Sequence, residues 1–375
     1  MDLKGRLQNL ATLESQYPHV LSVYLRCREG GRDRRKENLI FLKNRAADIQ
    51  SVMSGDKRGL EFLRQGLEQV ELIRRQDLSP NVIGLALFLQ GDKVIERFET
   101  SIPFEDQLAY RRFPFVSQLA YIGEEFEPYA VVHLDSRSAR IFEIALGELV
   151  DSSDIKSEVH RRIHRGGWSQ MRFQRGIEGE KHAHIQDVAD ALADLVSRHR
   201  YKRIVVIGPD KTRSILRDCL TADVARRIID GERVDSRSAD HELLQTAVDY
   251  FHKAEEEEES SKMDRVIREI HSTTMGVSGL EDTLKYLSRG QAYMVLLPTD
   301  LKQQGSQCNA CGMIFKDQAS SCHACESTDI SGVDLKEVVT RTAVKFGSQL
   351  EFVKNSEFQK KLGGAAALLR SPRIH

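Results

Sequence analysis

Two short apolar runs decide the fold of the central part of the chain: Tyr129-Ala130-Val131-Val132-His133-Leu134 and Ile204-Val205-Val206-Ile207-Gly208. Both are rich in β-branched residues and have the length of buried strands. An apolar face recurs between them at helical spacing, formed by Ile185, Val188, Ala189, Leu192, Leu195 and Val196. A strand, a helix and a second strand in this order predict an α/β layer.

Further patterns extend this layer. Residues 139–144 are the expected hairpin partner of the first strand, and a helix is expected from about Thr212. A long helical pattern covers residues 238–270 and contains the acidic run 255–259. Such a run is typical of a solvated helix face, and a contact for a basic partner is the alternative. We therefore predict a middle α/β domain over residues 128–275.

The chain before this domain, residues 1–127, is predicted to be an N-terminal α+β domain. A strand over 19–25 is followed by an arginine- and glycine-rich loop over 28–35 and by two helices. Two strands then flank Gly91-Asp92. Glycine at the first central position suits a two-residue type II′ hairpin.

The chain after the middle domain, residues 276–375, again alternates between helical and strand patterns. Helices are expected over 280–287, 334–345 and 357–361, and strands over 292–297 and 349–353. This alternation predicts a second α/β domain, with a cysteine cluster inserted into it.

Length and composition agree with a multidomain globular protein. The chain has 375 residues, of which 40% are hydrophobic and 30% charged, enough for two or three domains. The net charge of -1 disfavours a globally basic nucleic-acid-coating protein but permits a local basic patch. No apolar run approaches the roughly 18 residues of a membrane span, and residues 1–10 lack a signal-peptide core. We expect a cytoplasmic protein that uses no membrane.

The cysteines form a metal-binding pattern. Four of the six stand as two C-x-x-C pairs separated by ten residues: Cys308, Cys311, Cys322 and Cys325. Four thiolates can converge tetrahedrally on one ion, and Gly312 permits the tight turn after the first pair. Zinc is favoured over a rubredoxin-like iron site, and a closed four-thiolate set predicts a structural role. Four free thiols or a redox pair are the alternatives, and His323 is expected to be a bystander.

A basic segment over residues 156–175 is the second chemical feature. Its cations are Lys156, Arg161, Arg162, Arg165, Arg172 and Arg175. At its centre stands Gly166-Gly167-Trp168-Ser169-Gln170. Arginines can grip phosphates, Trp168 can stack on a nucleobase, and Gln170 can orient a water without ionising. The alternative is an ordinary exposed loop whose tryptophan packs on the domain.

Three stretches resemble the archaeo-eukaryotic peptide-chain release factor family, which includes Pelota. The run Gly166-Gly167-Trp168-Ser169-Gln170-Met171-Arg172-Phe173 stands at the place of the family's GGQ-type loop, before a long amphipathic helix. Residues 346–353 and 362–370 resemble the family's final strand and glycine-rich end. The cysteine ribbon is similar to that of archaeal release factors. The chain most resembles the bacterial branch, and it also resembles the quality-control branch that cleaves peptidyl-tRNA on stalled large subunits.

The resemblance implies a three-domain release-factor-like architecture, with a zinc ribbon inserted in an L7Ae-like last domain. It implies that Gln170 positions water at the ester joining peptide to tRNA, while Gly166 and Gly167 permit close approach. The RNA-binding residues implied are Arg161, Arg162, Arg165, Trp168, Arg172 and Arg175. The implied partners are the ribosome, its rRNA, tRNA and a translational GTPase.

Two departures shape the functional expectation. Trp168 and Ser169 separate the glycines from Gln170, and residues 1–127 contain no NIKS-like stop-codon-reading motif. We therefore expect a peptidyl-tRNA hydrolase that rescues stalled ribosomes or large subunits without reading a stop codon. One alternative is a non-catalytic hibernation or rescue factor in the ribosomal A site. Another is an RNA-binding module acting on free tRNA. The basic run 32–36 is either an RNA contact or a solvated loop.

Overall fold

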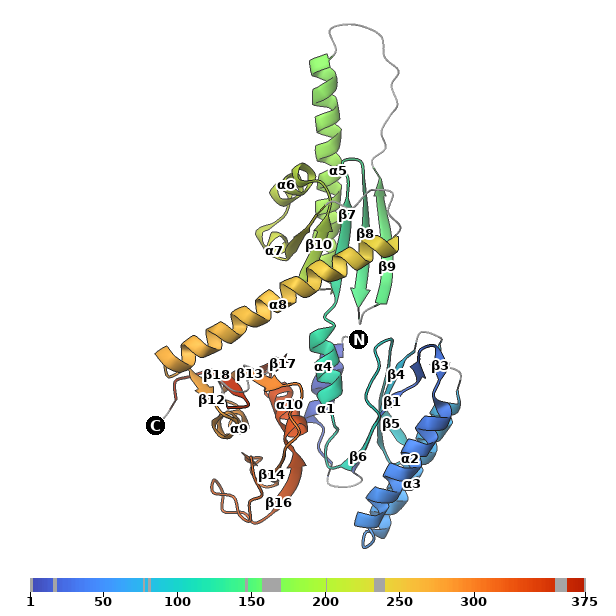
Figure 1. Ribbon diagram of the computed structural model, residues 1–375, viewed down its shortest axis with the longest axis vertical. Coiled ribbons are helices and arrows are strands. Elements are labelled where there is room, and N and C mark those ends of the chain that lie inside the picture. The colour runs from blue at the N-terminus through green and yellow to red at the C-terminus, as the bar shows by residue number, and fades with distance from the viewer. Residues whose placement is uncertain are drawn as a thin grey trace. The chain divides into compact units, whose positions relative to one another are not determined.

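The chain folds into two compact units (Figure 1). A computed structural model describes residues 3–15, 19–76, 78–79, 82–145, 148–156, 170–199, 201–232, 240–354 and 363–373. The middle unit is Phe126–Ser261, and the terminal unit combines Met1–Glu125 with Lys262–His375. The first predicted domain boundary, after residue 127, lies close to the boundary between these units. The division into three domains stays a prediction.

A five-stranded sheet forms the centre of the middle unit, in the order β11-β10-β7-β8-β9. Its strands are β7 (Tyr129–Leu134), β8 (Ser138–Ala145), β9 (Glu148–Lys156), β10 (Arg203–Ile207) and β11 (Ile228–Gly231). β10 is parallel to β7 and β11, whereas β8 and β9 are antiparallel to their neighbours. The three predicted strands are confirmed. The sequence analysis missed β9 and β11, because one is polar and the other has only four residues.

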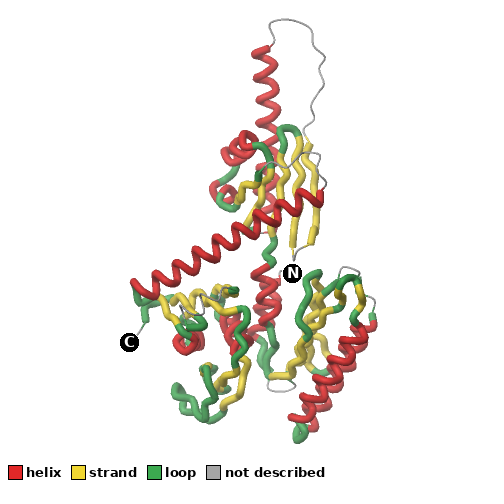
Figure 2. The backbone as a smooth tube through the Cα atoms, viewed as in Figure 1, coloured by secondary structure: helices red, strands yellow, loops and turns green. Residues whose placement is uncertain are grey.

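Helices cover both faces of this sheet (Figure 2). They are α5 (Gln170–His199), α6 (Asp210–Cys219), α7 (Ala222–Ala225) and the first part of α8 (Asp240–Ser272). On one face, the predicted apolar residues of α5 pack with Val132 and Ile204. On the other, Leu243 and Phe251 of α8 pack with Val131. Alternate side chains of each strand thus enter two different cores.

α5 is longer than its sequence pattern indicates. The apolar face read from the sequence begins at Ile185, whereas the helix begins at Gln170. Glu178, Gly179 and Glu180 are exposed, so the buried apolar stripe of α5 does not include these three residues. Figure 1 shows the N-terminal part of α5 extending past the end of the sheet.

The N-terminal part of the terminal unit contains a four-stranded antiparallel sheet, in the order β5-β4-β1-β6. Its strands are β1 (Val20–Arg26), β4 (Gly84–Gln90), β5 (Lys93–Thr100) and β6 (Gln107–Arg111). The helices α2 (Arg35–Val52) and α3 (Lys57–Arg75) pack on this sheet through a core that includes Leu42, Leu63 and Leu87. Gln90 pairs with Lys93, and Gly91 has φ of 59°, so the predicted two-residue hairpin is confirmed.

The expected arginine-rich loop contains a small hairpin. It consists of β2 (Arg28–Glu29) and β3 (Arg32–Asp33), joined by Gly30 and Gly31 with φ of 54° and 78°. Arg34 lies 3.2 Å from the Asp106 carboxylate, and Arg35 lies 3.1 Å from Asp33. Part of the positive charge of the run 32–36 is therefore neutralised within the unit.

The C-terminal part of the terminal unit has its own sheet, in the order β12-β18-β13-β17. The strands are β12 (Gly276–Ser278), β13 (Ala292–Pro298), β17 (Gln349–Val353) and β18 (Ala366–Leu369), and the helices are α9 (Leu280–Ser288) and α10 (Leu335–Lys345). A ribbon of β14 (Gln304–Cys308), β15 (Ile314–Phe315) and β16 (Ile330–Asp334) is inserted between β13 and α10. This confirms the predicted α/β alternation. The helix expected over 357–361 lies outside the described residues.

The terminal unit has two further helices, α1 (Leu3–Thr12) and α4 (Ser117–Glu125). Both contact α10, so the N-terminal and C-terminal parts of this unit pack together there. Glu337 of α10 is 3% exposed. Its Oε2 accepts hydrogen bonds from the backbone N–H groups of Val116, at 2.9 Å, and Ser117, at 3.0 Å. The Ser117 hydroxyl donates a hydrogen bond to Oε1 of Glu337. A carboxylate from the C-terminal part thus satisfies N–H groups at the start of α4.

Arg341, one turn further along α10, makes a second connection. Its side chain is 4% exposed, and its guanidinium lies 2.7 Å from the Glu14 carboxylate after α1. The Glu14 side chain is half exposed, so this ion pair contributes modestly to stability. Glu337, in contrast, is buried, so its hydrogen bonds matter more for stability.

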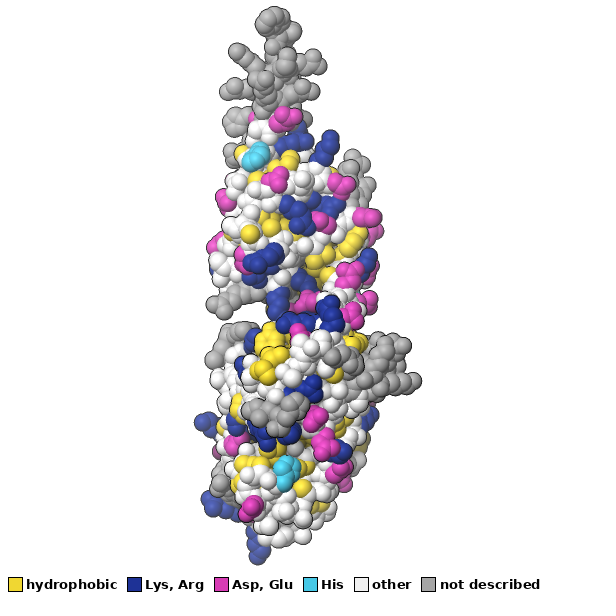
Figure 3. All heavy atoms as spheres, turned by 90° about the vertical axis from the view of Figure 1, so that its left-hand side faces the viewer, with side chains coloured by type: hydrophobic (Ala, Val, Ile, Leu, Met, Phe, Trp, Pro, Cys, Tyr) yellow, Lys and Arg dark blue, Asp and Glu magenta, His cyan; other side chains and the backbone are white. Residues whose placement is uncertain are grey.

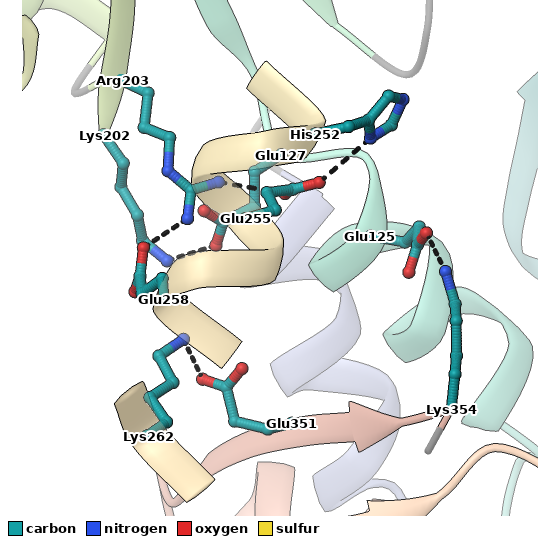
Figure 4. Close-up of polar contacts among 10 residues, drawn as sticks. All are labelled: Glu125, Glu127, Lys202, Arg203, His252, Glu255, Glu258, Lys262, Glu351 and Lys354. Atoms are coloured by element: carbon teal, nitrogen blue, oxygen red, sulfur yellow. Dashed lines mark hydrogen bonds and ion pairs between the residues drawn. The ribbon is translucent and has the colours of Figure 1, made fainter. Parts of the chain in front are cut away.

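The chain passes from one unit to the other twice, after Glu125 and after Ser261. Ion pairs within each unit hold the residues near these two points (Figure 4). Within the middle unit, Arg203 pairs with Glu255, at 3.0 Å, and with Glu258, and Lys202 pairs with Glu127. The acidic run 255–259 is therefore only partly the solvated face that its sequence indicates.

Within the terminal unit, both anchoring residues come from β17 or the residue after it (Figure 4). Glu351 pairs with Lys262 of α8 at 2.6 Å, and Lys354 pairs with Glu125.

Among the described helices, none is both long enough and apolar enough to span a bilayer.

We predict that Glu337 makes the stability of the terminal unit fall as pH rises. Burial raises the pKa of Glu337 to about 7, from an ordinary value of 4.5. Between these values the folded state binds more protons than the unfolded state, so the free energy of unfolding decreases with pH. The full loss, roughly 3 kcal/mol, is reached above the folded pKa.

Urea unfolding at several pH values across this window tests the prediction. Glu337→Gln should flatten the pH dependence, because the amide keeps an acceptor for the two N–H groups and a donor for the Ser117 hydroxyl. The control Glu68→Gln, on the exposed face of α3, should retain the wild-type slope. An unchanged slope in Glu337→Gln would contradict the assignment.

Candidate functional site

The basic segment with the Gly-Gly-Trp-Ser-Gln run connects β9 to α5. β9 ends at Lys156, and α5 begins at Gln170, with Arg172 and Arg175 in its first two turns. The other predicted site residues lie outside the described residues: Arg161, Arg162, Arg165, Gly166, Gly167 and Trp168. The structure therefore places the predicted catalytic glutamine at a helix N-terminus.

The N-terminus of α5 has an electrostatic character of its own. The first N–H groups of a helix have no partner within the helix and carry partial positive charge. No acidic residue lies in the first turn of α5. On the face drawn in Figure 3, Lys and Arg are interspersed with Asp and Glu over the described part of the middle unit. In the sequence of the segment 156–175, by contrast, Glu158 is the only acid among six Lys and Arg residues.

The second half of α5 holds this helix on the unit. Ile185, Val188 and Leu192 are each at most 1% exposed and lie in the core beneath the sheet. The apolar stripe read from the sequence is confirmed by this burial. Nearer the N-terminus of this helix, Glu178, Gly179 and Glu180 are exposed.

The four predicted metal ligands come together in the ribbon. Their sulfur atoms all lie within 4.8 Å of one another. The Cys308 and Cys325 sulfurs are 3.6 Å apart, and those of Cys311 and Cys322 are 3.5 Å apart. A tetrahedral ion with metal–sulfur bonds of about 2.3 Å requires sulfurs about 3.8 Å apart. The four cysteines could hold a metal ion, and no other such group occurs among the described residues.

The first pair of cysteines lies on a tight turn. The N–H of Gly312 donates to the Cys308 carbonyl at 2.9 Å, and the N–H of Cys308 donates to the Met313 carbonyl at 2.9 Å. Gly312 has φ of 81°, which a residue with a Cβ rarely adopts. The glycine expected to permit this turn therefore does so.

The second pair repeats the same hydrogen bonds. The N–H of Glu326 donates to the Cys322 carbonyl at 2.7 Å, and the N–H of Cys322 donates to the Ser327 carbonyl at 2.8 Å. Glu326 takes the place of Gly312 and has φ of 60°, the only positive φ among the described non-glycine residues. The sequence analysis missed Glu326, although its position directly after the second pair was the available signal.

The surroundings of the four cysteines fix the ribbon. Cys308 and Cys322 are buried with Met313, whereas Cys311 and Cys325 are exposed. His323 is exposed, and its ring centroid lies 5.1 Å from that of Phe315. It is not part of the four-sulfur group, in agreement with its expected role as a bystander.

We predict opposite effects of glycine at the two turns. Gly312→Val should weaken metal affinity roughly tenfold, because a left-handed conformation costs a residue with a Cβ about 1–2 kcal/mol. Glu326→Gly should leave affinity equal or strengthen it a few-fold, because it removes that strain. Competition with a chromophoric chelator measures both effects, with His323→Ala as the unaffected control. Equal losses in both turn variants would contradict the repeated geometry.

Comparison with known proteins agrees with these features. Residues 114–252 match the family described as "Bacterial archaeo-eukaryotic release factor family 10". This match covers the sheet of the middle unit, the segment 156–175 and α5. The chain is 22% identical, over 412 aligned positions, to peptide chain release factor subunit 1 of Thermococcus onnurineus, covering 98% of this chain and 97% of the relative.

Solved structures of similar proteins come from the same group. A crystal structure of the archaeal translation termination factor aRF1 is 17% identical, covers 98% of this chain and 97% of its own, and has a TM-score of 0.26. A model of ribosome-bound archaeal Pelota and ABCE1 is 12% identical, covers 100% of this chain and 95% of its own, and has a TM-score of 0.41. The sequence matches carry the relationship to this group.

These matches make the chain similar to archaeo-eukaryotic release factors. The predicted resemblance to the archaeo-eukaryotic release factor and Pelota family, in its bacterial branch, is confirmed. The similarity also extends further than the motifs that carried the prediction. It covers the N-terminal part of the chain, for which the sequence analysis found no family motif.

Proposed function

We propose that this protein associates with the ribosome in the cytoplasm and hydrolyses the peptidyl-tRNA ester on stalled ribosomes or large subunits, without reading a stop codon. The observation that carries the proposal is the run Gly166-Gly167-Trp168-Ser169-Gln170, which lies inside the matched residues 114–252 and ends on the first residue of α5.

The chemistry needs little from the protein beyond positioning. Water attacks the ester carbonyl, the bond to the tRNA ribose oxygen breaks, and that oxygen leaves with a proton derived from the water. The Gln170 amide would orient the water, and backbone N–H groups would stabilise the developing oxyanion. Gly166 and Gly167 would permit close approach to the tRNA end. No titrating side chain is required.

The basic residues of the segment would hold RNA. Arg165, Arg172 and Arg175 would contact phosphates of rRNA or of the tRNA acceptor end, with Arg161 and Arg162 alongside. Trp168 would stack on a base. A translational GTPase partner is proposed on the family resemblance alone.

The four-cysteine site would hold structural zinc. The sulfur spacing fits a tetrahedral ion, and four thiolates leave no position for a substrate. Zinc would hold both turns of the ribbon together and contribute folding energy to the C-terminal part of the terminal unit.

Gln170→Ala should abolish ester cleavage and leave ribosome binding intact, because only the orienting amide is lost. The measurement is release of labelled peptide from peptidyl-tRNA on purified bacterial large subunits, together with co-sedimentation. Gln174→Ala is the matched control, since it removes the same amide one turn later in α5. Unchanged release by Gln170→Ala would refute the assignment.

A second candidate is a non-catalytic factor that occupies the ribosomal A site. Trp168 and Ser169 separate the glycines from Gln170, and this departure from the family tripeptide favours it. No release by the wild-type protein, with retained binding to idle ribosomes, would support this candidate.

Binding to free tRNA as tight as binding to ribosomes would support action on tRNA off the ribosome.

Removal of zinc should lower the melting temperature of the terminal unit. Chelation and Cys322→Ser should have similar effects, because each breaks the four-thiolate set. Cys219→Ser in the middle unit is the control and should melt like the wild type. Calorimetry with metal analysis makes the measurement, and an unchanged transition after metal loss would contradict a structural role.

A further inference from the structure

Three chain segments meet at one end of the C-terminal sheet of the terminal unit. They are the turn after α9, the turn after α10, and Arg370, which follows β18. The Arg370 guanidinium donates to the carbonyls of Ala292, at 3.2 Å, and Phe346, at 2.9 Å. The Ser348 hydroxyl also donates to the Ala292 carbonyl, at 2.8 Å. A Cβ placed on Gly290 would lie 3.3 Å from the Phe346 ring. These contacts join the three segments into one surface.

Two aromatic rings are exposed on these segments. Tyr293 is 37% exposed and Phe346 is 41% exposed, and the large exposed hydrophobic side chains elsewhere in the described chain are aliphatic. Tyr293 lies where the register between β13 and β18 shifts, next to Ala292. Phe346 ends α10, beside Gly347 with φ of 64°. Both rings are thus held by backbone that the sheet and helix fix.

The charge of these segments has one sign. Residues 285–293, 345–350 and 369–373 contain no Asp or Glu, and their cations are Lys285, Arg289, Lys345, Arg370 and Arg373. Lys345 pairs with Glu14. Lys285, Arg289 and Arg370 form no ion pair with a carboxylate of the described residues. Arg370 also occupies carbonyls at the end of α10, which offsets the negative end of that helix.

We propose that this surface, the Tyr293–Phe346 patch, binds an unpaired stretch of RNA. The patch consists of Lys285, Arg289, Tyr293, Phe346 and Arg370. Bases would stack on the two rings, and Lys285 and Arg289 would hold phosphates. The five residues of the patch include three cations and no acid, and the neighbouring Glu14 is paired with Lys345 and Arg341. This charge favours a polyanion over a protein surface of mixed charge. The proposed ribosome association supplies the RNA, whereas ester hydrolysis is not needed for this binding.

The test is binding of the full-length protein to a short single-stranded oligoribonucleotide containing 4-thiouridine. Fluorescence anisotropy gives the affinity, and photocrosslinking followed by mass spectrometry locates the contact. The double variant Tyr293→Ala, Phe346→Ala should bind about tenfold or more weakly and lose crosslinks to residues 285–293 and 345–350. Arg289→Glu should weaken binding and reduce its dependence on salt.

Matched controls separate the patch from general effects. Leu72→Ala removes an exposed apolar side chain from α3, and Lys302→Glu reverses an exposed charge outside the patch. Both should bind like the wild type. Tyr293→Phe should retain affinity, since the ring remains. Arg370 is left intact, because it also holds the end of α10.

Unchanged affinity and crosslinks in the double variant would overturn the proposal. Loss of binding to a translational GTPase, with RNA binding unchanged, would also overturn it and identify the patch as a protein contact. Failure of the hydrolase proposal gives a different result. In that case peptide release is absent from the wild type, while the patch variants still bind RNA more weakly than the wild type.

Discussion

The carboxylate of Glu337 accepts hydrogen bonds from N–H groups 221 and 220 positions away in the chain. A buried polar group without such partners costs free energy, so α4 and α10 stabilise each other. This arrangement makes the first and last parts of the chain one folded unit. Both ends of the middle unit, at Phe126 and Ser261, therefore connect to the same folded unit.

Within the middle unit, the two halves of α5 differ in burial. Its second half carries the apolar stripe that closes the core, and its first half extends past the sheet with exposed polar residues. Gln170, Arg172 and Arg175 lie in that portion of the helix.

The ribbon shows how a small element without a large core can be fixed. Two turns with the same hydrogen bonds bring four sulfurs to within 4.8 Å, so one ion can replace an apolar core. The exposed sulfurs of Cys311 and Cys325 lie on different turns. A metal bound there would connect the two turns directly.

The sequence by itself determined the features that depend on neighbouring residues. It predicted β7, β10 and α3, the Gly91 hairpin and the four-cysteine site, because periodicity, turn chemistry and ligand spacing are local. Only tertiary structure decided the polar edge strand β9 and the start of α5 at Gln170, where no apolar pattern marks the element. The bond between Glu337 and α4 was also beyond sequence reasoning, because a glutamate in a helical pattern reads as a surface residue. Its burial depends on the packing of residues more than 200 positions away.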